Sequence, residues 1–290
     1  MQISLRSVII GTSAFCNASC IHCPTGKPET AHLPKRVMAL ELFESLVRQI
    51  AGNRWSVSRN LSLGLFGDGL LDPLVVRRCE VVRRWLPKAP LAVNTNGAAY
   101  DRAKHLPLVD LVHSISLHVE SLRPEVYDFI MQPLRFERVF PKIQMILEDF
   151  GRKVTPGTPL HRLNIGEREA LIAFFKRAGA REVHFAAISN RCSESSAFNF
   201  MSFAPIAAPC RSEIATDLIV DWDGQVFLCC NDFRKEMPVG DITKQNLKEV
   251  LADGRRHDAI ADLVAGNADH VKTCANCKWD KIDPKLIGMH

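Results

Sequence analysis

The first two thirds of the chain alternate between short apolar runs and longer segments with apolar residues at helical spacing. The apolar runs predict strands at residues 7–11, 61–67, 91–94, 111–119, 160–163 and 182–188. The helical spacing predicts helices at residues 38–50, 75–86, 124–131, 136–150 and 164–178, with a short one near Asp101. The fifth of these begins with a capping-box pattern at Asn164 and Glu167. Strands that alternate with helices in this way predict parallel βαβ units, hence an α/β fold.

The pattern changes after Met201, where the strand–helix alternation stops. Two apolar segments, residues 218–222 and 225–228, are joined by Asp223-Gly224, which is a two-residue hairpin signal. We therefore expect two domains, at residues 1–200 and 201–290.

Three cysteines follow the first predicted strand with the spacing C-x3-C-x2-C, at Cys16, Cys20 and Cys23. Thiolates at this density suit a soft metal or an iron–sulfur cluster. A closed structural zinc site takes four protein ligands, whereas a cubane held by three cysteines leaves one iron open to a small molecule. The count therefore favours a cluster, with a zinc knuckle as the alternative.

Most of the remaining cysteines lie in the C-terminal half of the chain, and the exception is Cys79. Cys210, Cys229, Cys274 and Cys277 give the spacing C-x18-C-x44-C-x2-C, which fits either a zinc ribbon or a second iron–sulfur cluster. Neighbouring strand residues point to opposite sides, so we expect Cys230 to face away from Cys229 as a small buried hydrophobe. We also expect Cys79, within a predicted helix, to be structural.

Composition and charge argue against several classes of partner and location. The 290 residues carry a net charge of +5 without a run of Lys or Arg, which argues against a nucleic-acid partner. No apolar stretch approaches about 18 residues, so no membrane span is expected. The N-terminus has no secretory h-region, and ten cysteines without an export signal favour metal ligation over disulfides. We expect the chain to be cytoplasmic.

The cysteine motif, its early position and the strand before it resemble the radical S-adenosylmethionine (SAM) superfamily. With the hairpin, the later cysteines resemble the twitch domain, a shortened SPASM domain. The resemblance implies a partial (β/α)6 barrel, two [4Fe–4S] clusters, SAM, and an external one-electron reductant of the flavodoxin or ferredoxin type. It implies that Cys16, Cys20 and Cys23 hold the first cluster, and that Cys210, Cys229, Cys274 and Cys277 hold the second.

The same resemblance implies a set of SAM contacts at the carboxyl ends of the strands. Gly67-Asp68-Gly69 resembles the superfamily's Gly-Glu-Pro element, with Asp68 in place of the usual Glu. The turn Thr95-Asn96-Gly97 is expected to shape the site. The other implied contacts are Ser116, His118, Asn164 and Asn190.

Asn190-Arg191-Cys192 follows the sixth predicted strand. It resembles an Asn-Arg pair of twitch-domain enzymes that oxidise an aminocyclitol, which implies that Arg191 contacts a substrate hydroxyl and that Asn190 lies beside the site. Cys192 then resembles the thiol of related epimerases, which gives a hydrogen atom to a substrate radical. We therefore expect an epimerase acting on a small carbohydrate or aminocyclitol, with Glu194 as a candidate for binding a substrate amine. The alternatives are a dehydrogenase, a peptide or protein maturase, and a non-enzymatic zinc-binding scaffold.

Overall fold

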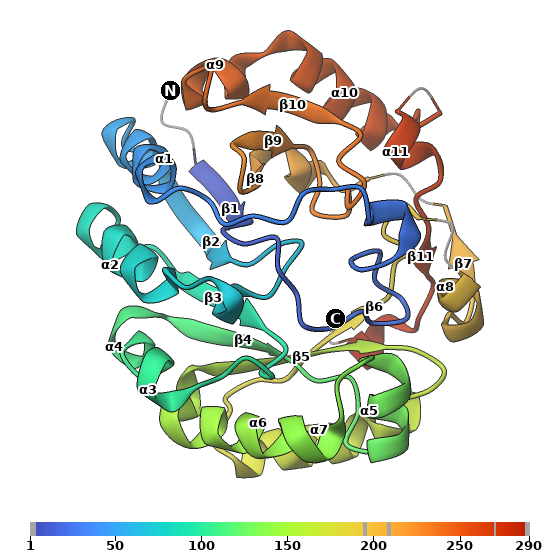
Figure 1. The fold of residues 1–290 in the computed structure, drawn as a ribbon. Helices are drawn as coiled ribbons and strands as arrows, with labels where there is room; N and C mark the ends of the chain where they lie inside the picture. The colour runs from blue at the N-terminus through green and yellow to red at the C-terminus, as the bar shows by residue number, and fades with distance from the viewer. Residues whose placement is uncertain (1–3, 194–195, 208–209, 270, 288–290) are drawn as a thin grey trace.

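One sheet runs through the molecule and contains both the first strand of the chain and the C-terminal hairpin. The computed structural model describes residues 4–193, 196–207, 210–269 and 271–287. Within them the main sheet has nine strands in the order β10-β9-β8-β1-β2-β3-β4-β5-β6. The sheet curves so that its concave side faces the loop after β1, drawn in blue in Figure 1.

The six parallel strands that alternate with helices in this sheet confirm the α/β prediction. The first five of them bury apolar side chains; Val8, Leu61 and Val93, for example, are fully buried. Consecutive strands from β1 to β6 pair in parallel through helical crossovers, so their carboxyl ends meet at one edge. They are β1 (Ser4–Ile10), β2 (Ser56–Leu63), β3 (Leu91–Thr95), β4 (Ser114–His118), β5 (Val154–Leu160) and β6 (His184–Ala187).

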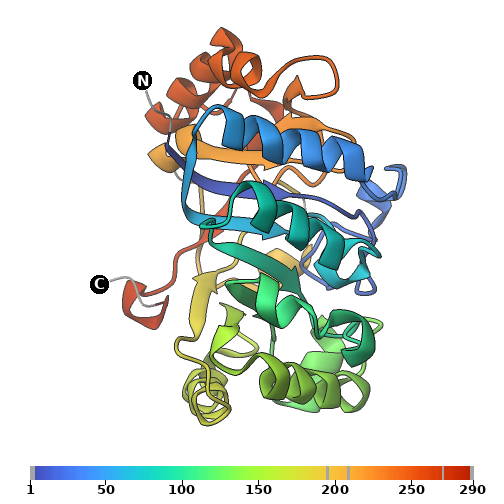
Figure 2. The same ribbon diagram turned by 90° about the vertical axis from the view of Figure 1, so that its left-hand side faces the viewer.

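The helices between these strands cover the outer, convex face of the sheet (Figure 2). Their apolar stripes explain this placement, since α1 buries Phe43, Leu46, Val47 and Ile50. The helices are α1 (Leu40–Gly52), α2 (Val75–Trp85), α3 (Arg102–His105), α4 (Leu108–Leu111), α5 (Pro124–Ile130), α6 (Phe136–Phe150) and α7 (Arg168–Arg177). Short 3-10 helices are η1 (Pro28–Thr30), η2 (Gly69–Leu71), η3 (Gly151–Lys153), η4 (Ile165–Glu167), η5 (Ser212–Thr216) and η6 (Pro284–Ile287).

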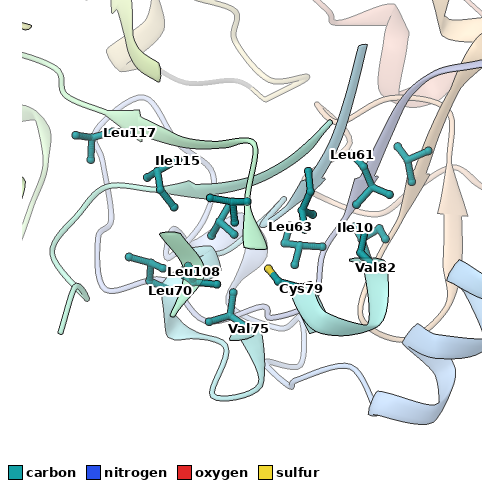
Figure 3. Close-up of a cluster of buried hydrophobic side chains, with 14 of the residues drawn as sticks. Ile10, Leu61, Leu63, Leu70, Val75, Cys79, Val82, Leu108, Ile115 and Leu117 are labelled. Carbon is teal, nitrogen blue, oxygen red and sulfur yellow. The ribbon is translucent and has the colours of Figure 1, made fainter. Parts of the chain in front are cut away.

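Cys79 belongs to the core between α2 and the sheet, as expected of a structural cysteine. Its side chain is fully buried and lies among Leu63, Val75 and Val82 in the cluster of Figure 3. Burial raises the pKa of this thiol to about 12, so it packs as a small neutral hydrophobe.

Two local predictions near β5 are wrong. The strand was expected at residues 160–163 but spans Val154–Leu160, because Pro156, Gly157 and Pro159 give this segment the composition of a loop. The expected capping box is also not formed. The Asn164 side chain bonds to the backbone of His161, Glu120 and Pro159, and Glu167 instead accepts hydrogen bonds from Ser121 and Arg123.

The C-terminal segment extends the same sheet instead of standing apart from it. β8 pairs in parallel with β1 and antiparallel with β9, which confirms the hairpin. Its loop has three residues, not the two expected, because Gly224 (φ +88°) forms a bulge before Gln225. The elements are α8 (Ser196–Met201), β7 (Pro205–Ile206), β8 (Asp217–Val220), β9 (Gln225–Phe227), β10 (Pro238–Asp241), α9 (Leu247–Ala252), α10 (Gly254–Ala265), α11 (Lys272–Ala275) and β11 (Trp279–Asp280).

The expected boundary near residue 200 stays a prediction, although β8 brings the later segment into direct backbone pairing with β1. β11 pairs with β7 in a separate two-stranded sheet. Among the described residues, no helix combines the length and the hydropathy that crossing a membrane requires.

Candidate functional site

A cavity of about 410 Å³ lies at the carboxyl ends of the parallel strands, and we call it the central cavity. The loop after β1 brings all three cysteines of the N-terminal motif to its wall. Loops after β2, β3, β4 and β6 complete the wall. Sites in α/β folds ordinarily lie at this end of the strands. Its polar lining includes Cys16, Cys20, His22, Cys23, Thr25, Asp68, Asn94, Thr95, Asn96, His118, Glu120, Ser189, Arg191, Cys230 and Asn231.

The cysteine loop is held in place by the turns after β2 and β3. The backbone N–H of Asp68 donates to the Phe15 carbonyl at 2.8 Å, directly before Cys16. A Cβ on Gly67 would lie 2.5 Å from that same carbonyl oxygen, so only glycine fits there. Asn96 Nδ2 donates to Asn17 Oδ1 at 2.8 Å within the loop itself. The Gly-Asp-Gly and Thr-Asn-Gly turns therefore fix the position of the three thiols.

The three thiols of this loop lie close enough to interact electrostatically. Burial, together with the neighbouring Asp68 and Cys23, raises the pKa of Cys16 to about 11. The pKa of Cys20 is also well above its usual range, through burial and then through Cys23 and Glu120. Buried sulfurs that repel each other as anions are stabilised when cationic iron binds them, because metal binding requires the thiolate. The donor set therefore fits an iron–sulfur cluster.

The predicted SAM contacts separate into two groups. Gly67, Asp68 and His118 line the central cavity. The Asp68 carboxylate is already fixed by Leu70 N, Thr95 Oγ1 and Asn96 N at 2.8–3.0 Å.

The second group does not line the cavity. It comprises Gly69, Ser116, Asn164 and Asn190. A Cβ on Gly69 would meet the Asn94 carbonyl at 2.8 Å, and the Asn164 amide is engaged by backbone groups. Gly69 and Asn164 therefore support the neighbouring loops.

Arg191 is the cation of the central cavity that sequence reasoning anticipated. Its Nη1 donates to Cys23 Sγ at 3.0 Å, and its guanidinium lies 5.0 Å from the ring centre of Phe233. Burial lowers the pKa of Arg191, but Cys23, Cys20 and Glu120 outweigh burial and hold it above its ordinary value. The group is therefore a permanent cation, suited to anchoring an oxygen and unsuited to acting as a base.

A buried group of His22, Glu120 and His161 was not anticipated from the sequence. His22 Nε2 and His161 Nε2 lie 3.5 and 3.4 Å from the two Glu120 carboxylate oxygens. Burial lowers the pKa of His22 to about 4, so its ring is neutral at neutral pH. Burial raises the pKa of Glu120, but the histidines outweigh it and keep the carboxylate ionised. Within the part of the chain that the structure describes, His22 Nδ1, Glu120 Oε2 and His161 Nε2 have no hydrogen-bond partner.

Of these three residues, His22 and Glu120 line the central cavity. Their unpartnered atoms suit a ligand with hydroxyl or amine groups, because buried polar atoms are ordinarily satisfied. One signal in the sequence was His22 within the cysteine motif, and another was Glu120 two residues beyond β4.

A second cavity, of about 480 Å³, lies beside the C-terminal hairpin, and we call it the C-terminal cavity. The four predicted ligands of a second cluster all line it, together with Cys192 and Cys230. The four are Cys210, Cys229, Cys274 and Cys277. Burial, together with Cys277 and Cys210, raises the pKa of Cys274 to about 12, so these thiols too lie close enough to interact electrostatically.

The expectation that Cys230 points away from Cys229 is wrong. β9 ends at Phe227, so the two cysteines lie in a turn where strand alternation does not apply. Both line the C-terminal cavity, and the neighbouring Cys230 raises the pKa of the Cys229 thiol. Cys230 also lines the central cavity, beside Arg191. It is therefore exposed to both sites.

Cys192 does not line the central cavity, where a hydrogen-atom donor to the substrate would have to lie. Its side chain is 4% exposed and lines the C-terminal cavity together with Cys277, which raises the pKa of the Cys192 thiol. It is absent from the described lining of the central cavity. The reason is the backbone, since Arg191 and Cys192 both adopt positive φ (51° and 57°), which turns their side chains toward different cavities.

Two further predictions are limited by what the structure describes. Glu194 lies outside the described residues. Among the residues that are described, no three or more His, Cys, Asp or Glu side chains are arranged to hold a single metal ion. Ligation by the two cysteine sets therefore stays a prediction.

A third cavity, of about 630 Å³, lies at the opposite, amino ends of the strands. Arg83, Lys88, Arg152, Lys153 and Arg181 give it a basic lining. It contains none of the predicted site residues.

Two family models match the chain. One, described as the radical SAM superfamily, matches residues 10–175. The other, SPASM, described as an iron–sulfur cluster-binding domain, matches residues 210–278. A search of curated proteins gave no match.

Solved structures share the fold at low sequence identity. BtrN in complex with AdoMet and 2-DOIA is 16% identical, with a TM-score of 0.68 over 96% of this chain and 94% of that one. Streptococcus suis SuiB bound to the precursor peptide SuiA is 13% identical, with a TM-score of 0.70 over 90% and 67%. Native anSMEcpe with bound AdoMet is 15% identical, with a TM-score of 0.67 over 89% and 84%. Since the first family model covers more than half of the chain, this protein belongs to the radical SAM superfamily and carries a C-terminal SPASM-type domain.

Proposed function

We propose that the protein is an epimerase that inverts a hydroxyl-bearing carbon of an aminocyclitol, an aminoglycoside or a related carbohydrate. The observation that carries this proposal is the position of Cys230. Its thiol belongs to neither predicted ligand set, yet it lines the central cavity together with Arg191. A hydrogen-atom donor therefore stands beside a cationic anchor for a substrate oxygen.

The residues present fit the cofactors that the family uses. Cys16, Cys20 and Cys23 would hold one [4Fe–4S] cluster, and the four ligands of the C-terminal cavity would hold another. Gly67, Asp68 and His118 would contact SAM. When bound, the N-terminal cluster and SAM supply a 5′-deoxyadenosyl radical, which takes one hydrogen atom from the substrate.

The chain's own residues then position the substrate and exclude water. Arg191 holds a substrate oxygen through its fixed donor geometry. Glu120, ionised and incompletely bonded, accepts hydrogen bonds from hydroxyl or ammonium groups. Phe66, Phe233 and Trp279 contribute aromatic wall, which limits side reactions of a radical with water.

Cys230 completes the inversion by giving a hydrogen atom to the substrate radical from the opposite face. In this step the S–H bond breaks, a C–H bond forms, and a thiyl radical remains on Cys230. One electron from a reductant of the flavodoxin or ferredoxin type and one proton from water restore the thiol. Cys192, which the sequence favours for this role, lies in the other cavity.

The second candidate is a dehydrogenase that oxidises a secondary alcohol of the same class of substrate. It is favoured by the likeness to BtrN over nearly the whole of both chains, since that structure holds 2-DOIA. A third candidate is a peptide or protein maturase, because SuiB is bound to a precursor peptide. The match covers 67% of SuiB.

The decisive experiment is turnover in deuterated water. The protein is reconstituted without oxygen and given SAM, a reductant, and a panel of aminocyclitols and aminoglycosides, and the products are read by mass spectrometry. An epimerase yields a product of unchanged composition that carries one solvent deuterium. Cys230→Ala should abolish this product, and Cys192→Ala should still form it.

Other outcomes decide between the alternatives. A product lighter by two hydrogens would establish the dehydrogenase. Deuterium incorporation that survives Cys230→Ala but is lost in Cys192→Ala would return the donor role to Cys192. Iron content of both variants serves as the control, because loss of a cluster also abolishes turnover.

A further inference from the structure

Arg191 contacts the third cysteine of the N-terminal motif, although the two residues are 168 positions apart in the chain. Its Nη1 donates to Cys23 Sγ at 3.0 Å, and both residues line the central cavity. Arginine keeps its proton in proteins and has no acceptor atom, so the guanidinium can only donate in this bond. A permanent positive charge therefore lies against a sulfur that belongs to the predicted ligand set of the N-terminal cluster.

The backbone directs the Arg191 side chain toward this sulfur. Arg191 and Cys192 both adopt positive φ, which consecutive non-glycine residues do only where the surrounding structure enforces it. Asn190 supplies that constraint. Its Oδ1 accepts from Cys192 N at 3.2 Å and Lys278 N at 2.9 Å, and its Nδ2 donates to the Asn276 carbonyl at 2.6 Å. The turn is therefore fixed by side-chain and backbone bonds that do not involve Cys23.

An aromatic ring covers the guanidinium. Its central carbon lies 5.0 Å from the ring centre of Phe233, which packs edge-on against Phe66 at 4.9 Å between ring centres. A cation over a ring face is attracted by the negative face of the ring. Both rings are buried, so water is kept from this side of the charge, and its field at the sulfur is less screened than at a surface.

The position of Cys23 is fixed separately from that of Arg191. The backbone N–H of Cys23 donates to the Cys20 carbonyl at 2.9 Å, within the motif itself. Two residues later, Thr25 Oγ1 donates to the Phe66 carbonyl at 3.0 Å, which ties the segment to the loop after β2. Because each partner has its own supports, the contact between them is built into the fold.

The chemistry of an iron–sulfur cluster gives this contact a consequence. A cysteine sulfur bound to iron carries no proton but keeps lone pairs, so it can still accept from Arg191. Hydrogen bonds to the sulfurs and the local charge are among the factors that set a cluster's reduction potential. Reduction adds negative charge, which a nearby cation stabilises. Arg191 therefore favours the reduced form over the oxidised one.

We propose that Arg191 raises the reduction potential of the N-terminal cluster by donating a charge-assisted hydrogen bond to Cys23. This role is additional to holding a substrate oxygen, because the other N–H groups of the guanidinium remain for the substrate. The proposal rests on the N-terminal cluster of the proposed function but not on its reaction.

Potentiometric titration of the reconstituted holoprotein, followed by electron paramagnetic resonance, measures this effect. The signal that changes when SAM is added belongs to the N-terminal cluster, and its midpoint is then read without SAM. Arg191→Met removes the charge and the donors but keeps an unbranched stem, and Arg191→Lys keeps the charge. Arg168→Met is the matched control, because Arg168 lies over Phe185 and donates to the Leu286 carbonyl instead of a sulfur.

We expect all four proteins to bind the same amount of iron. The midpoint potential of the N-terminal cluster should shift to a more negative value in Arg191→Met, shift less in Arg191→Lys, and stay unchanged in Arg168→Met. An unchanged midpoint in Arg191→Met would overturn the proposal. If Arg191→Met does not assemble the cluster, Arg191→Lys decides, and an unchanged midpoint there overturns the proposal. Loss of the cluster in both variants would also overturn it, because Arg191 would then act through assembly.

Failure of this proposal and failure of the proposed function give different results. If the midpoint shifts as expected while no aminocyclitol is epimerised, the role of Arg191 stands and only the reaction is wrong. If the deuterated epimer forms while the midpoint of Arg191→Met equals that of the wild type, this proposal alone fails. A reconstituted protein without a cluster signal that responds to SAM would overturn both.

Discussion

Arg191 illustrates how one side chain can serve both a cluster site and a substrate site. Its guanidinium donates to Cys23 Sγ and lies over Phe233, with five donors in a fixed plane. Lysine would keep the charge but lose the plane, the stacking and the second donor direction. We expect Arg191→Lys to lower turnover by roughly 100-fold, the scale of a small misplacement of substrate, while iron content stays unchanged.

Turnover and iron per chain measure this effect, and Arg168→Lys is the matched control. Arg168 also lies over a phenylalanine, 5.1 Å from the ring centre of Phe185, but it does not line the central cavity. A turnover loss that is equal in both variants would contradict a specific role for Arg191. So would loss of iron in Arg191→Lys alone, since the residue would then act through the cluster's assembly.

At this scale the sequence predicted the chemistry better than the direction in which side chains point. The cysteine spacings identified both sets of thiols, and both sets line cavities as expected. The orientation of Cys192 depends on two positive φ values, which no local pattern of non-glycine residues indicates. Cys230 was misplaced for a related reason, because the end of β9 at Phe227 could not be fixed from apolar alternation.

Among the elements, helix α2 is joined to its neighbours by a buried ion pair. Arg78 and Asp72 are fully buried, and Arg78 Nε donates to Asp72 Oδ2 at 2.6 Å. Arg78 Nη2 also donates to the Met38 carbonyl before α1. Arg78→Met would leave the Asp72 carboxylate buried without a cation. We expect the free energy of unfolding to fall by about 3–5 kcal/mol, measured by urea denaturation.

The adjacent residue provides the control for this prediction. Arg77 pairs with Glu80 on the same helix, but both side chains are about half exposed, at 50% and 43%. We expect Arg77→Met to change stability by less than about 0.5 kcal/mol. Equal effects of the two substitutions would show that burial of the Arg78 pair does not decide its contribution.

The short helix α3 contains a buried histidine that should make the stability of the protein depend on pH. His105 is buried, and its Nδ1 accepts a hydrogen bond from Asp101 N at 3.0 Å, which requires that nitrogen to be unprotonated. Burial lowers the pKa of His105 below its ordinary value. The unfolded chain, where histidine titrates near about 6.5, therefore binds the proton first. Stability from this residue is present above that pH and is lost as the pH falls below it.

Urea denaturation between about pH 8 and pH 5 measures this loss. We expect His105→Gln to give a flatter dependence of the unfolding free energy on pH than the wild type. His32→Gln, at an exposed position, should leave the wild-type profile unchanged. A profile that is identical in His105→Gln and wild type would contradict the assignment.

Helices and strands with a clear hydrophobic periodicity were predictable from the sequence. Those that form only through pairing with neighbouring strands were not. Helix α2 was expected at residues 75–86 and spans Val75–Trp85, because its apolar stripe faces a continuous core. β5 was displaced by several residues in the prediction. Its Pro-Gly-Thr-Pro composition forms a strand only because β4 and β6 pair with it on both sides.

For the whole molecule, the main consequence of the fold is that one sheet joins the N-terminal and C-terminal segments. β1 pairs with β2 on one side and with β8 on the other. Arg6 Nη1 contacts Asp217 Oδ1 across this junction at 3.2 Å, and Gln49 Oε1 accepts from Leu247 N at 2.6 Å. Removing the C-terminal segment would expose the backbone edge of β1, which is an aggregation hazard.

We therefore expect the full-length holoprotein to unfold in one cooperative transition. Circular dichroism would follow the helices, and cluster absorbance would follow the cysteine sites. Single-tryptophan variants that retain Trp55, directly before β2, or Trp222, in the β8–β9 loop, would follow the two segments separately. Coincident transitions are the expected result, because neither segment can leave without exposing β1. A first transition confined to Trp222, with the Trp55 signal and the helices intact, would show that the hairpin is an independent unit. It would also support the boundary near residue 200 that sequence alone suggested, whereas a single transition would mean that the two family segments fold as one body.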